Sequence, residues 1–295
     1  MIQIGELIDD RYRVTRELGE GGMANVYEAK DIITRKTVAI KIIKDDVMKN
    51  PMNLTRFERE ARACAALDHQ NIVRVINLGT YQGKPYMANE FIKGQTLRDV
   101  LDNRTRYPFL EACDVMYQLC GAVAHAHSHL VIHRDIKPQN VYMMADGTVK
   151  LGDFGIATFE NSSRVTKSEV IVGSVHYMAP EISQGKPASF QSDIYSLGIT
   201  FFEVITGRVP FDNATPIAVA LAHVKEKFPT PRKFLPTTPK AIEKIIMKAC
   251  RKNPADRYRN VAEMQRDIRH IIENPKLIKP RRSLASKIFG FATED

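Results

Sequence analysis

The stretch VIHRDIKPQN, residues 131–140, brings acidic, basic and amide side chains close together in the sequence. Asp135 can accept a proton from an attacking hydroxyl group or orient that group. Lys137 can neutralise charge on a transferring phosphoryl group, and Asn140 offers a carbonyl oxygen to a metal ion. A polar surface turn would explain the same residues, since Pro and Asn are common in turns. The remainder of the chain decides between the two interpretations.

Two more acidic residues extend this set toward the C-terminus. Asp153 lies in GDFG, thirteen residues after Asn140, and its carboxylate is a ligand suited to Mg²⁺. Glu181 ends the loop GSVHYMAPE, and Arg257 in ADRYR is a candidate internal partner for its charge. Taken singly, each of these residues also fits an ordinary solvated loop.

Three further features lie near the N-terminus. The segment LGEGGMANV contains three glycines, which let backbone N–H groups approach a phosphate chain, although a glycine-rich β-turn would contain the same residues. Lys41 closes the β-branched stretch VAIK, and Glu60 follows nineteen residues later at a helical position from which it could reach the lysine. On their own, both charges are better explained as solvated side chains.

The pattern around these residues predicts a β-rich first part and a helical second part. Runs of β-branched and aromatic residues before residue 90 predict short strands, interrupted by one amphipathic helix over 54–67. After residue 94 helical spacing dominates, and the nearly all-apolar stretch 193–207 predicts a buried helix that ends at Gly207. A crevice between two such lobes is a natural place for a ligand.

The composition is that of a soluble globular protein, with 295 residues, 44% hydrophobic and 26% charged. No apolar run reaches the ~18 residues that span a bilayer, and the N-terminus has no signal-peptide pattern. The four cysteines lack metal or redox spacing, which predicts buried thiols in a reducing cytoplasm. The net charge of +9 is scattered and accompanies no nucleic-acid-binding motif, so we expect no nucleic-acid partner.

In combination, the motifs follow the order and spacing of the protein-kinase signature set: glycine-rich loop, VAIK lysine, helix glutamate, HRD loop, DFG and APE. Over residues 11–272 the chain resembles a Hanks-type protein kinase. The resemblance implies an α+β, bilobal kinase fold over residues 1–275, with a small β-rich N-lobe containing one long helix (1–89), a hinge (90–94) and a mainly helical C-lobe (95–275). Residues 276–295 would form a basic tail.

The resemblance also implies a binding site for ATP. Lys41 would hold the α- and β-phosphates and would itself be positioned by Glu60. The backbone of the hinge would meet the adenine base, whose two faces would be covered by side chains from the two lobes. These residues would be Glu90 and Ile92 at the hinge, Ala39 and Tyr142 on the two faces, and Leu18, Gly19, Gly21, Gly22 and Val26 in the glycine-rich loop.

For catalysis, the resemblance implies that Asp135 positions the substrate hydroxyl group and Lys137 stabilises the transferring γ-phosphate. Asn140 and Asp153 would bind Mg²⁺ or Mn²⁺, and Lys41 would complete the catalytic set. His133 would be a packing residue rather than a general base. Structural roles would fall to Arg134, Glu181, Asp193 and Arg257.

Two residues favour serine and threonine over tyrosine as phosphate acceptors. Lys137 within HRDIKPQN and Ser174 before VHYMAPE both resemble the corresponding residues of Ser/Thr kinases. We therefore expect a serine/threonine protein kinase that uses ATP and acts on protein substrates. The alternative is a nucleotide-binding pseudokinase scaffold, but none of the residues that catalysis needs is missing.

The segment between the DFG and APE motifs would be the activation loop. We predict that the kinase phosphorylates itself there at Thr166 and Ser168, and that Arg134 binds the added phosphate. A loop that is merely polar and flexible is the alternative interpretation.

Within the family, the chain is most similar to bacterial eukaryotic-like Ser/Thr kinases, and its N-terminus MIQIGELIDDRYRV resembles the PASTA-repeat receptor kinases. That similarity implies phosphorylation of other copies in trans, with N-lobe pairing as in relatives, and a cytoplasmic location. The basic tail is interpreted as a juxtamembrane remnant of a membrane-anchored kinase or as a free tail. Ala24 replaces the third glycine, Asn89 occupies the gatekeeper position and Tyr142 is an unusual adenine floor.

Overall fold

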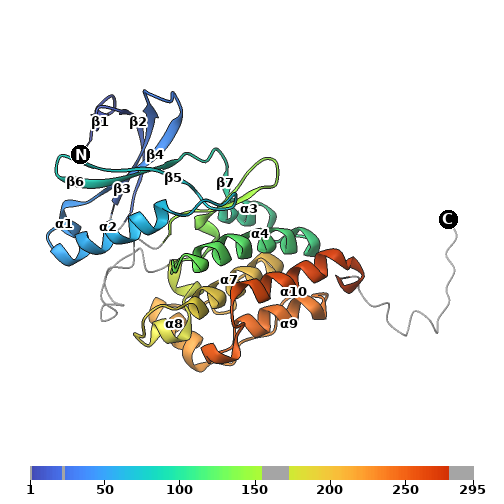
Figure 1. Ribbon diagram of the computed structural model, residues 1–295. Helices are drawn as coiled ribbons and strands as arrows, with labels where there is room; N and C mark the ends of the chain where they lie inside the picture. The colour runs from blue at the N-terminus through green and yellow to red at the C-terminus, as the bar shows by residue number, and fades with distance from the viewer. Residues whose placement is uncertain (1, 22–23, 155–172, 279–295) are drawn as a thin grey trace, which may run out of the picture.

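The chain folds into two lobes of different secondary structure, as Figure 1 shows. The computed structural model describes residues 2–21, 24–154 and 173–278. The N-terminal lobe is a twisted antiparallel sheet with one long helix, and the larger second lobe is mainly helical. The predicted α+β architecture of a β-rich lobe followed by a helical lobe is therefore confirmed.

The N-terminal sheet gains its two faces from side-chain alternation. In β4, Val38, Ile40 and Ile42 are buried on one face, so Ala39 and Lys41 point to the other. Tyr12 and Tyr86 complete the apolar cluster on the first face. The sheet has the order β1-β2-β3-β4-β6-β5, with β1 at Leu7–Ile8, β2 at Tyr12–Glu20, β3 at Ala24–Asp31, β4 at Thr37–Ile43, β5 at Val75–Tyr81 and β6 at Lys84–Glu90.

Helix α2, Pro51–Ala65, packs on the sheet beside the short helix α1, Asp45–Met48. Pro51 at its first turn and the Asn50 cap, whose side chain accepts the Met52 N–H at 3.0 Å, explain where it begins. Phe57 and Ala61 are buried against Ile43 of β4. This packing fixes the helix that carries Glu60.

The helical lobe is built around α7, Phe190–Thr206, which is buried on nearly every side. The helix ends at Gly207, whose φ of +77° is the left-handed conformation that glycine adopts at no steric cost. Sequence periodicity predicted both features. The other helices are α3 at Leu97–Arg104, α4 at Phe109–Ser128, α6 at Pro180–Ser183, α8 at Pro216–Lys225, α9 at Lys240–Ala249 and α10 at Val261–Glu273.

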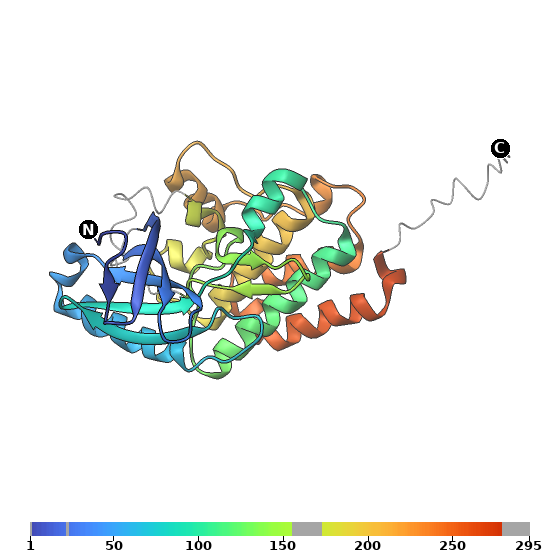
Figure 2. The same cartoon turned by 90° about the horizontal axis from the view of Figure 1, so that it is seen from above.

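A small sheet lies where the two lobes meet. It has the order β7-β8-β9, with β7 at Gln95–Thr96, β8 at Val141–Met143 and β9 at Val149–Leu151. The 3₁₀ turns are η1 at Pro138–Asn140, η2 at Val175–Tyr177, η3 at Pro231–Lys233, η4 at Pro254–Asp256 and η5 at Pro275–Ile278. Figure 2 shows α10 running alongside α4, and Gln265 of α10 donates to the Tyr117 carbonyl of α4 at 3.1 Å.

All four cysteines are buried free thiols, as predicted, and burial raises the pKa of Cys64 and Cys113 to about 12. Within the described residues, the helices are each too short or too polar to cross a membrane.

Candidate active site

The inner face of the N-terminal sheet carries the residues expected to cover a nucleotide. Val26 of β3 lies directly opposite Lys41 of β4 in the antiparallel ladder, and Ala39 lies on the same face two residues away. The Gly21 N–H donates to the Ala24 carbonyl at 2.9 Å and closes the turn between β2 and β3. Gly22 lies outside the described residues.

The expected hinge begins at Glu90, the last residue of β6. Its carboxylate binds the Lys150 ammonium of β9 at 2.6 Å and accepts the Arg74 N–H at 2.8 Å. The Glu90 N–H donates to the Arg74 carbonyl at 2.9 Å. The side chain therefore ties β6 to β9, and the expected adenine contacts of Glu90 and Ile92 would come from their backbone.

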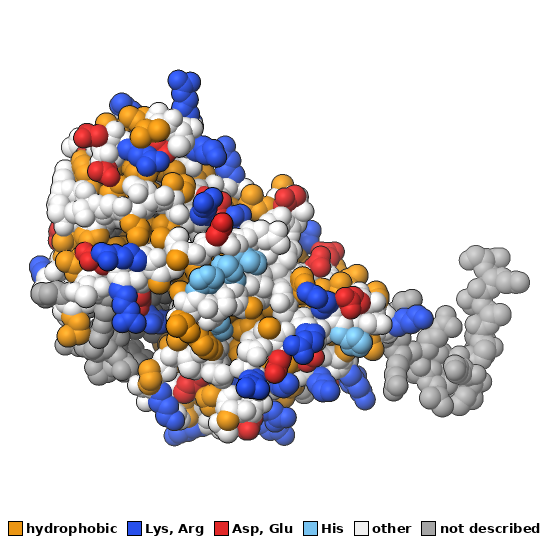
Figure 3. All heavy atoms as spheres, viewed as in Figure 1, with side chains coloured by type: hydrophobic (Ala, Val, Ile, Leu, Met, Phe, Trp, Pro, Cys, Tyr) orange, Lys and Arg blue, Asp and Glu red, His pale blue; other side chains and the backbone are white. Residues whose placement is uncertain are grey.

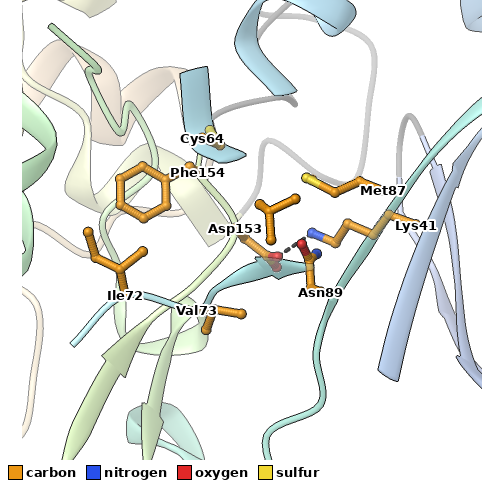
Figure 4. Close-up of a pocket in the computed structure, with 9 residues that line it drawn as sticks. Lys41, Cys64, Ile72, Val73, Met87, Asn89, Asp153 and Phe154 are labelled. Carbon is orange, nitrogen blue, oxygen red and sulfur yellow. Dashed lines mark hydrogen bonds and ion pairs between the residues drawn. The ribbon is translucent and has the colours of Figure 1, made fainter. Parts of the chain in front are cut away.

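Behind the nucleotide face, Lys41 and Asp153 point toward one another at a small cavity of about 20 Å³ (Figure 4). The Lys41 ammonium contacts the Asp153 carboxylate directly. Burial opposes ionisation of Asp153, but the neighbouring Lys41 charge outweighs it and lowers the pKa of this carboxyl below its usual value. Asn89 and Cys64 line the same cavity. The carboxylate is thus held ionised at neutral pH.

The structure does not form the expected pair between Lys41 and Glu60. Instead, Glu60 Oε1 lies 2.5 Å from Arg134 Nη1, while Lys41 is paired with Asp153. Both side chains of the Glu60–Arg134 pair are mostly buried, at 24% and 30% exposed. The reason is that two cations compete for the Glu60 carboxylate, and Arg134 lies close enough to Glu60 to replace Lys41 as its partner. This ion pairing differs from the sequence expectation.

The polar side chains of HRDIKPQN, the expected catalytic loop, lie close together in the structure. Lys137 Nζ lies 2.7 Å from Asp135 Oδ2 and donates to the Ser174 hydroxyl at 2.6 Å. The Asn140 amide donates to the Asp135 carboxylate at 3.0 Å and to its carbonyl at 2.7 Å. Asp135 is therefore fixed on two sides, with Lys137 bridging to the segment that precedes the APE motif.

The side chains of Asn140 and Asp153 suit a hard divalent cation. Because the Asn140 Nδ2 group is used on Asp135, its Oδ1 atom is the one left to meet a metal ion. Asp153 supplies an ionised carboxylate, and oxygen donors of this kind are what Mg²⁺ prefers. The two residues fit a Mg²⁺ that would be completed by phosphate oxygens and water.

Asp193 of α7 holds the backbone of the expected catalytic loop in place. Its buried carboxylate accepts the N–H groups of His133 at 2.8 Å and Arg134 at 2.9 Å, and it also meets His127 Nε2 at 2.8 Å. Arg134 has a φ of +70°, a strained conformation for a residue with a long side chain. The Asp193 hydrogen bonds hold that strained turn in place, as its expected structural role required.

His133 is buried and hydrogen-bonded through both ring nitrogens. Nδ1 accepts the Asp135 N–H at 3.2 Å, so the proton resides on Nε2 and is donated to the Gly152 carbonyl at 2.9 Å. Burial lowers the pKa of this imidazole. His133 is therefore a neutral scaffold residue that packs against the Phe154 ring.

Tyr142 explains why glycine precedes Asp153. A Cβ atom built on Gly152 would lie 2.7 Å from Tyr142 Cε2, well inside van der Waals contact. The small residue at 152 therefore makes room for the Tyr142 ring beside the DFG motif. Burial also raises the pKa of the Tyr142 hydroxyl.

The predicted partner of Glu181 is confirmed. Arg257 donates to both carboxylate oxygens of Glu181 at 2.7 Å, and the two side chains are 0% and 7% exposed. Arg257 also donates to the carbonyls of Gln191, Arg251 and Lys252 at 2.7, 2.7 and 3.1 Å. This buried fork fixes the end of the APE segment to the helical lobe.

Sequence reasoning missed two polar clusters beside the site. Asn71 donates through its amide to Val149 O at 2.7 Å and Gln118 Oε1 at 2.9 Å, which joins the turn after α2 to β9 and α4. Glu203 within α7 binds Arg98 at 2.6 Å and accepts the Tyr177 hydroxyl at 2.5 Å. The detectable signal for Glu203 was an acid within the apolar second half of α7, because such a charge needs a buried partner.

Comparison with known proteins places these features in a family. The protein kinase domain family matches residues 12–270. The probable serine/threonine-protein kinase PknB of Lactococcus lactis is 41% identical over 269 residues, which are 91% of this chain and 43% of that protein. Serine/threonine-protein kinase PrkC of Bacillus subtilis is 40% identical over 278 residues, 94% of this chain and 43% of that protein.

The chain therefore spans less than half the length of these curated relatives. The crystal structure of the Mycobacterium tuberculosis PknI kinase domain has the same fold, with a TM-score of 0.74 and 24% identity over 92% of this chain and 99% of that one. The catalytic-loop geometry, the Glu181–Arg257 pair and the match over residues 12–270 agree. The chain belongs to the protein kinase family.

Proposed function

We propose that this chain is a serine/threonine protein kinase, with its kinase domain over residues 1–275, that transfers the γ-phosphate of ATP to protein hydroxyl groups. The observation that carries the proposal is Lys137, held between Asp135 at 2.7 Å and the Ser174 hydroxyl at 2.6 Å. Ser174 resembles the small hydroxyl residue that Ser/Thr kinases carry in the surface that receives the protein substrate. The names of the relatives support the same acceptor class.

Each side chain has a task in this reaction. Asp135 would accept a hydrogen bond from the substrate hydroxyl and aim its oxygen at the γ-phosphorus. Lys137 would neutralise charge that develops on the transferred group, and Lys41 would hold the α- and β-phosphates. Mg²⁺ held by Asn140 and Asp153 would supply charge neutralisation on the phosphate oxygens. Alignment and charge neutralisation dominate because phosphoryl transfer needs little covalent help.

The direct test is phosphate transfer from γ-labelled ATP with Mg²⁺ to paired peptides that differ only in Ser, Thr or Tyr at one position. We expect Ser and Thr peptides to be labelled and the Tyr peptide to remain unlabelled. Asp135→Asn should lower the rate by about 10²- to 10⁴-fold, the usual contribution of a positioned acid–base group. ATP binding without turnover by the parent chain would instead support the pseudokinase scaffold.

We also propose that activation includes an exchange of ion pairs. Thr166 and Ser168, the predicted autophosphorylation sites, lie outside the described residues. The proposal is supported by Arg134, which binds Glu60 at 2.5 Å and would be needed to bind a loop phosphate. A loop phosphate that binds Arg134 would release Glu60 from this arginine. Glu60 would then be free to pair with Lys41.

This exchange predicts opposite effects of one substitution in two backgrounds. In a Thr166→Ala/Ser168→Ala chain, Arg134→Gln should raise basal activity by about two- to fivefold, because an ion pair of this exposure is worth up to about 1 kcal/mol. In the phosphorylatable chain the same substitution should lower activity, since the phosphate loses its cation. Arg104→Gln, at an exposed arginine, is the control. An equal decrease in both backgrounds would refute the exchange.

We propose that copies of the chain phosphorylate one another in trans, with N-lobe pairing as the geometry of that encounter. The basic tail, 276–295, would be a juxtamembrane segment of a longer cytoplasmic kinase that is anchored further along the chain. The partial coverage of the relatives, 43% of their length, is compatible with such an extension.

A further inference from the structure

Three histidines form a row at the junction of the two lobes, here called the histidine row: His69, His125 and His129. The His69 and His125 ring centroids are 5.2 Å apart, and those of His125 and His129 are 4.5 Å apart. His69 lies in the turn that follows α2, whereas His125 and His129 lie one turn apart at the end of α4. Figure 3 shows histidine side chains gathered in one patch on this face.

The turn that carries His69 fastens α2 to the helical lobe. Leu67 and Ile72, which flank the histidine, are buried in the same core as α4. The Ile72 N–H donates to the His69 carbonyl at 3.0 Å, and the Val73 N–H donates to the Leu151 carbonyl of β9 at 2.9 Å. Because Glu60 lies on α2, any movement of this turn changes where Glu60 lies relative to its partners.

The hydrogen bonds of the row suit neutral imidazoles. His69 Nδ1 accepts the Asn71 N–H at 3.1 Å, so a proton added at Nδ1 would remove this bond. His125 Nε2 is buried without a hydrogen-bond partner among the described residues, so a proton there would be a donor without an acceptor. His129 Nδ1 lies 3.0 Å from the His125 carbonyl, a contact that holds the His129 ring beside His125.

Few charges face the row to compensate for protonation. Asp68, in the same turn, is the acid whose charge favours a protonated His125, while His129 opposes it. From α10, the neutral amide of Gln265 and the His69 ring both lie near Gly121, and Arg269, one turn further on, is bonded to the Tyr117 hydroxyl. Burial, followed by the neighbouring imidazole, lowers the pKa of both His69 and His125.

We propose that the histidine row is a proton-sensitive contact that holds α2 against α4 at neutral pH and loosens this attachment in acid. Protonation would place like charges on neighbouring rings and remove the Asn71–His69 hydrogen bond. The turn would then separate from α4, and α2 would lose its fixed position. Kinase activity would fall for this reason, a consequence that rests on the proposed function.

The sign of the expected pH dependence follows from the linkage between proton binding and opening of the contact. A base whose pKa is lower in the folded protein than the ordinary 6.5 binds more protons when the contact is open. The stabilising contribution is therefore fully present above pH 6.5 and is lost as the pH falls below it. Each unit of pKa difference corresponds to a change of about tenfold in the opening equilibrium.

The test is amide hydrogen exchange of Ile72 and Val73 at pH 7.5 and 5.5, corrected for intrinsic rates, in the parent chain and in His125→Gln/His129→Gln. We expect opening of this turn to increase by about three- to tenfold at pH 5.5 in the parent, and by less than about twofold in the variant. His129→Gln alone, at an exposed position, should give an intermediate change. This single variant keeps the test valid if the double variant does not fold. His270→Gln, which removes an exposed histidine outside the row, should behave like the parent.

Equal acid-induced opening in the parent and both row variants would overturn the proposal. A parallel assay compares the ratio of kinase rates at pH 5.5 and 7.5, which should be higher in the double variant than in the parent. Hydrogen exchange needs no catalysis, so exchange that follows the row in a chain without kinase activity would contradict the proposed function and leave the proton-sensitive contact standing.

Discussion

Replacing Asp153 with Asn is expected to lower the rate of phosphate transfer by about 10³-fold or more, as for other groups that stabilise transferring phosphate charge. The amide keeps the size of the side chain but removes its negative charge. Lys41 then loses its partner, and the proposed Mg²⁺ site loses its one ionised oxygen ligand. The measurement is kcat for a Ser peptide at saturating Mg²⁺ and ATP.

Asp146→Asn provides a matched control for this prediction. Asp146 is exposed in the turn between β8 and β9, where it accepts the Thr148 N–H at 2.9 Å. The same chemical change there should alter kcat by less than about twofold, because surface substitutions rarely have large effects. Thermal unfolding of both variants checks that the fold survives. Retention of more than a tenth of the parent rate in Asp153→Asn would refute the assigned role.

Replacing Glu181 with Gln is expected to lower the free energy of unfolding by about 3–5 kcal/mol, because it leaves the Arg257 guanidinium buried without its counter-charge. Arg257 is 0% exposed in its side chain, so water cannot replace the lost partner. A loss of this size is a large part of the total stability of a typical domain, about 5–15 kcal/mol. Urea unfolding at neutral pH gives the value.

A solvent-exposed pair supplies the comparison for the buried one. Glu111 lies 3.2 Å from Arg104, and both side chains are 56% exposed. Glu111→Gln should change the free energy of unfolding by no more than about 1 kcal/mol, since water screens such pairs. The double substitution Glu181→Met/Arg257→Met should recover part of the lost stability, because neither charge then remains buried, although three carbonyls lose the Arg257 donor. Similar losses in Glu181→Gln and Glu111→Gln would contradict the argument from burial.

Local patterns in the sequence determined which chemistry the chain can support. Asp135, Lys137 and Asn140 are separated by so few residues that one turn of chain brings them together, whatever surrounds it. Helix α7 and its end at Gly207 also follow from local rules, because a helix that is apolar on nearly every side must be buried and glycine tolerates a positive φ. For the Glu181–Arg257 pair, the sequence offered one candidate partner, and the structure confirms it.

The tertiary structure alone decided which charges pair across the two lobes. Glu60 faces Lys41 or Arg134 according to where α2 lies, and residue types and spacing are the same in either case. The histidine row is likewise absent from any sequence pattern, since His69 and His125 are distant in the chain and meet through packing of the α2 turn on α4. The physical reason is that ion pairs and ring contacts depend on distances of a few ångströms, which the packing of distant elements sets.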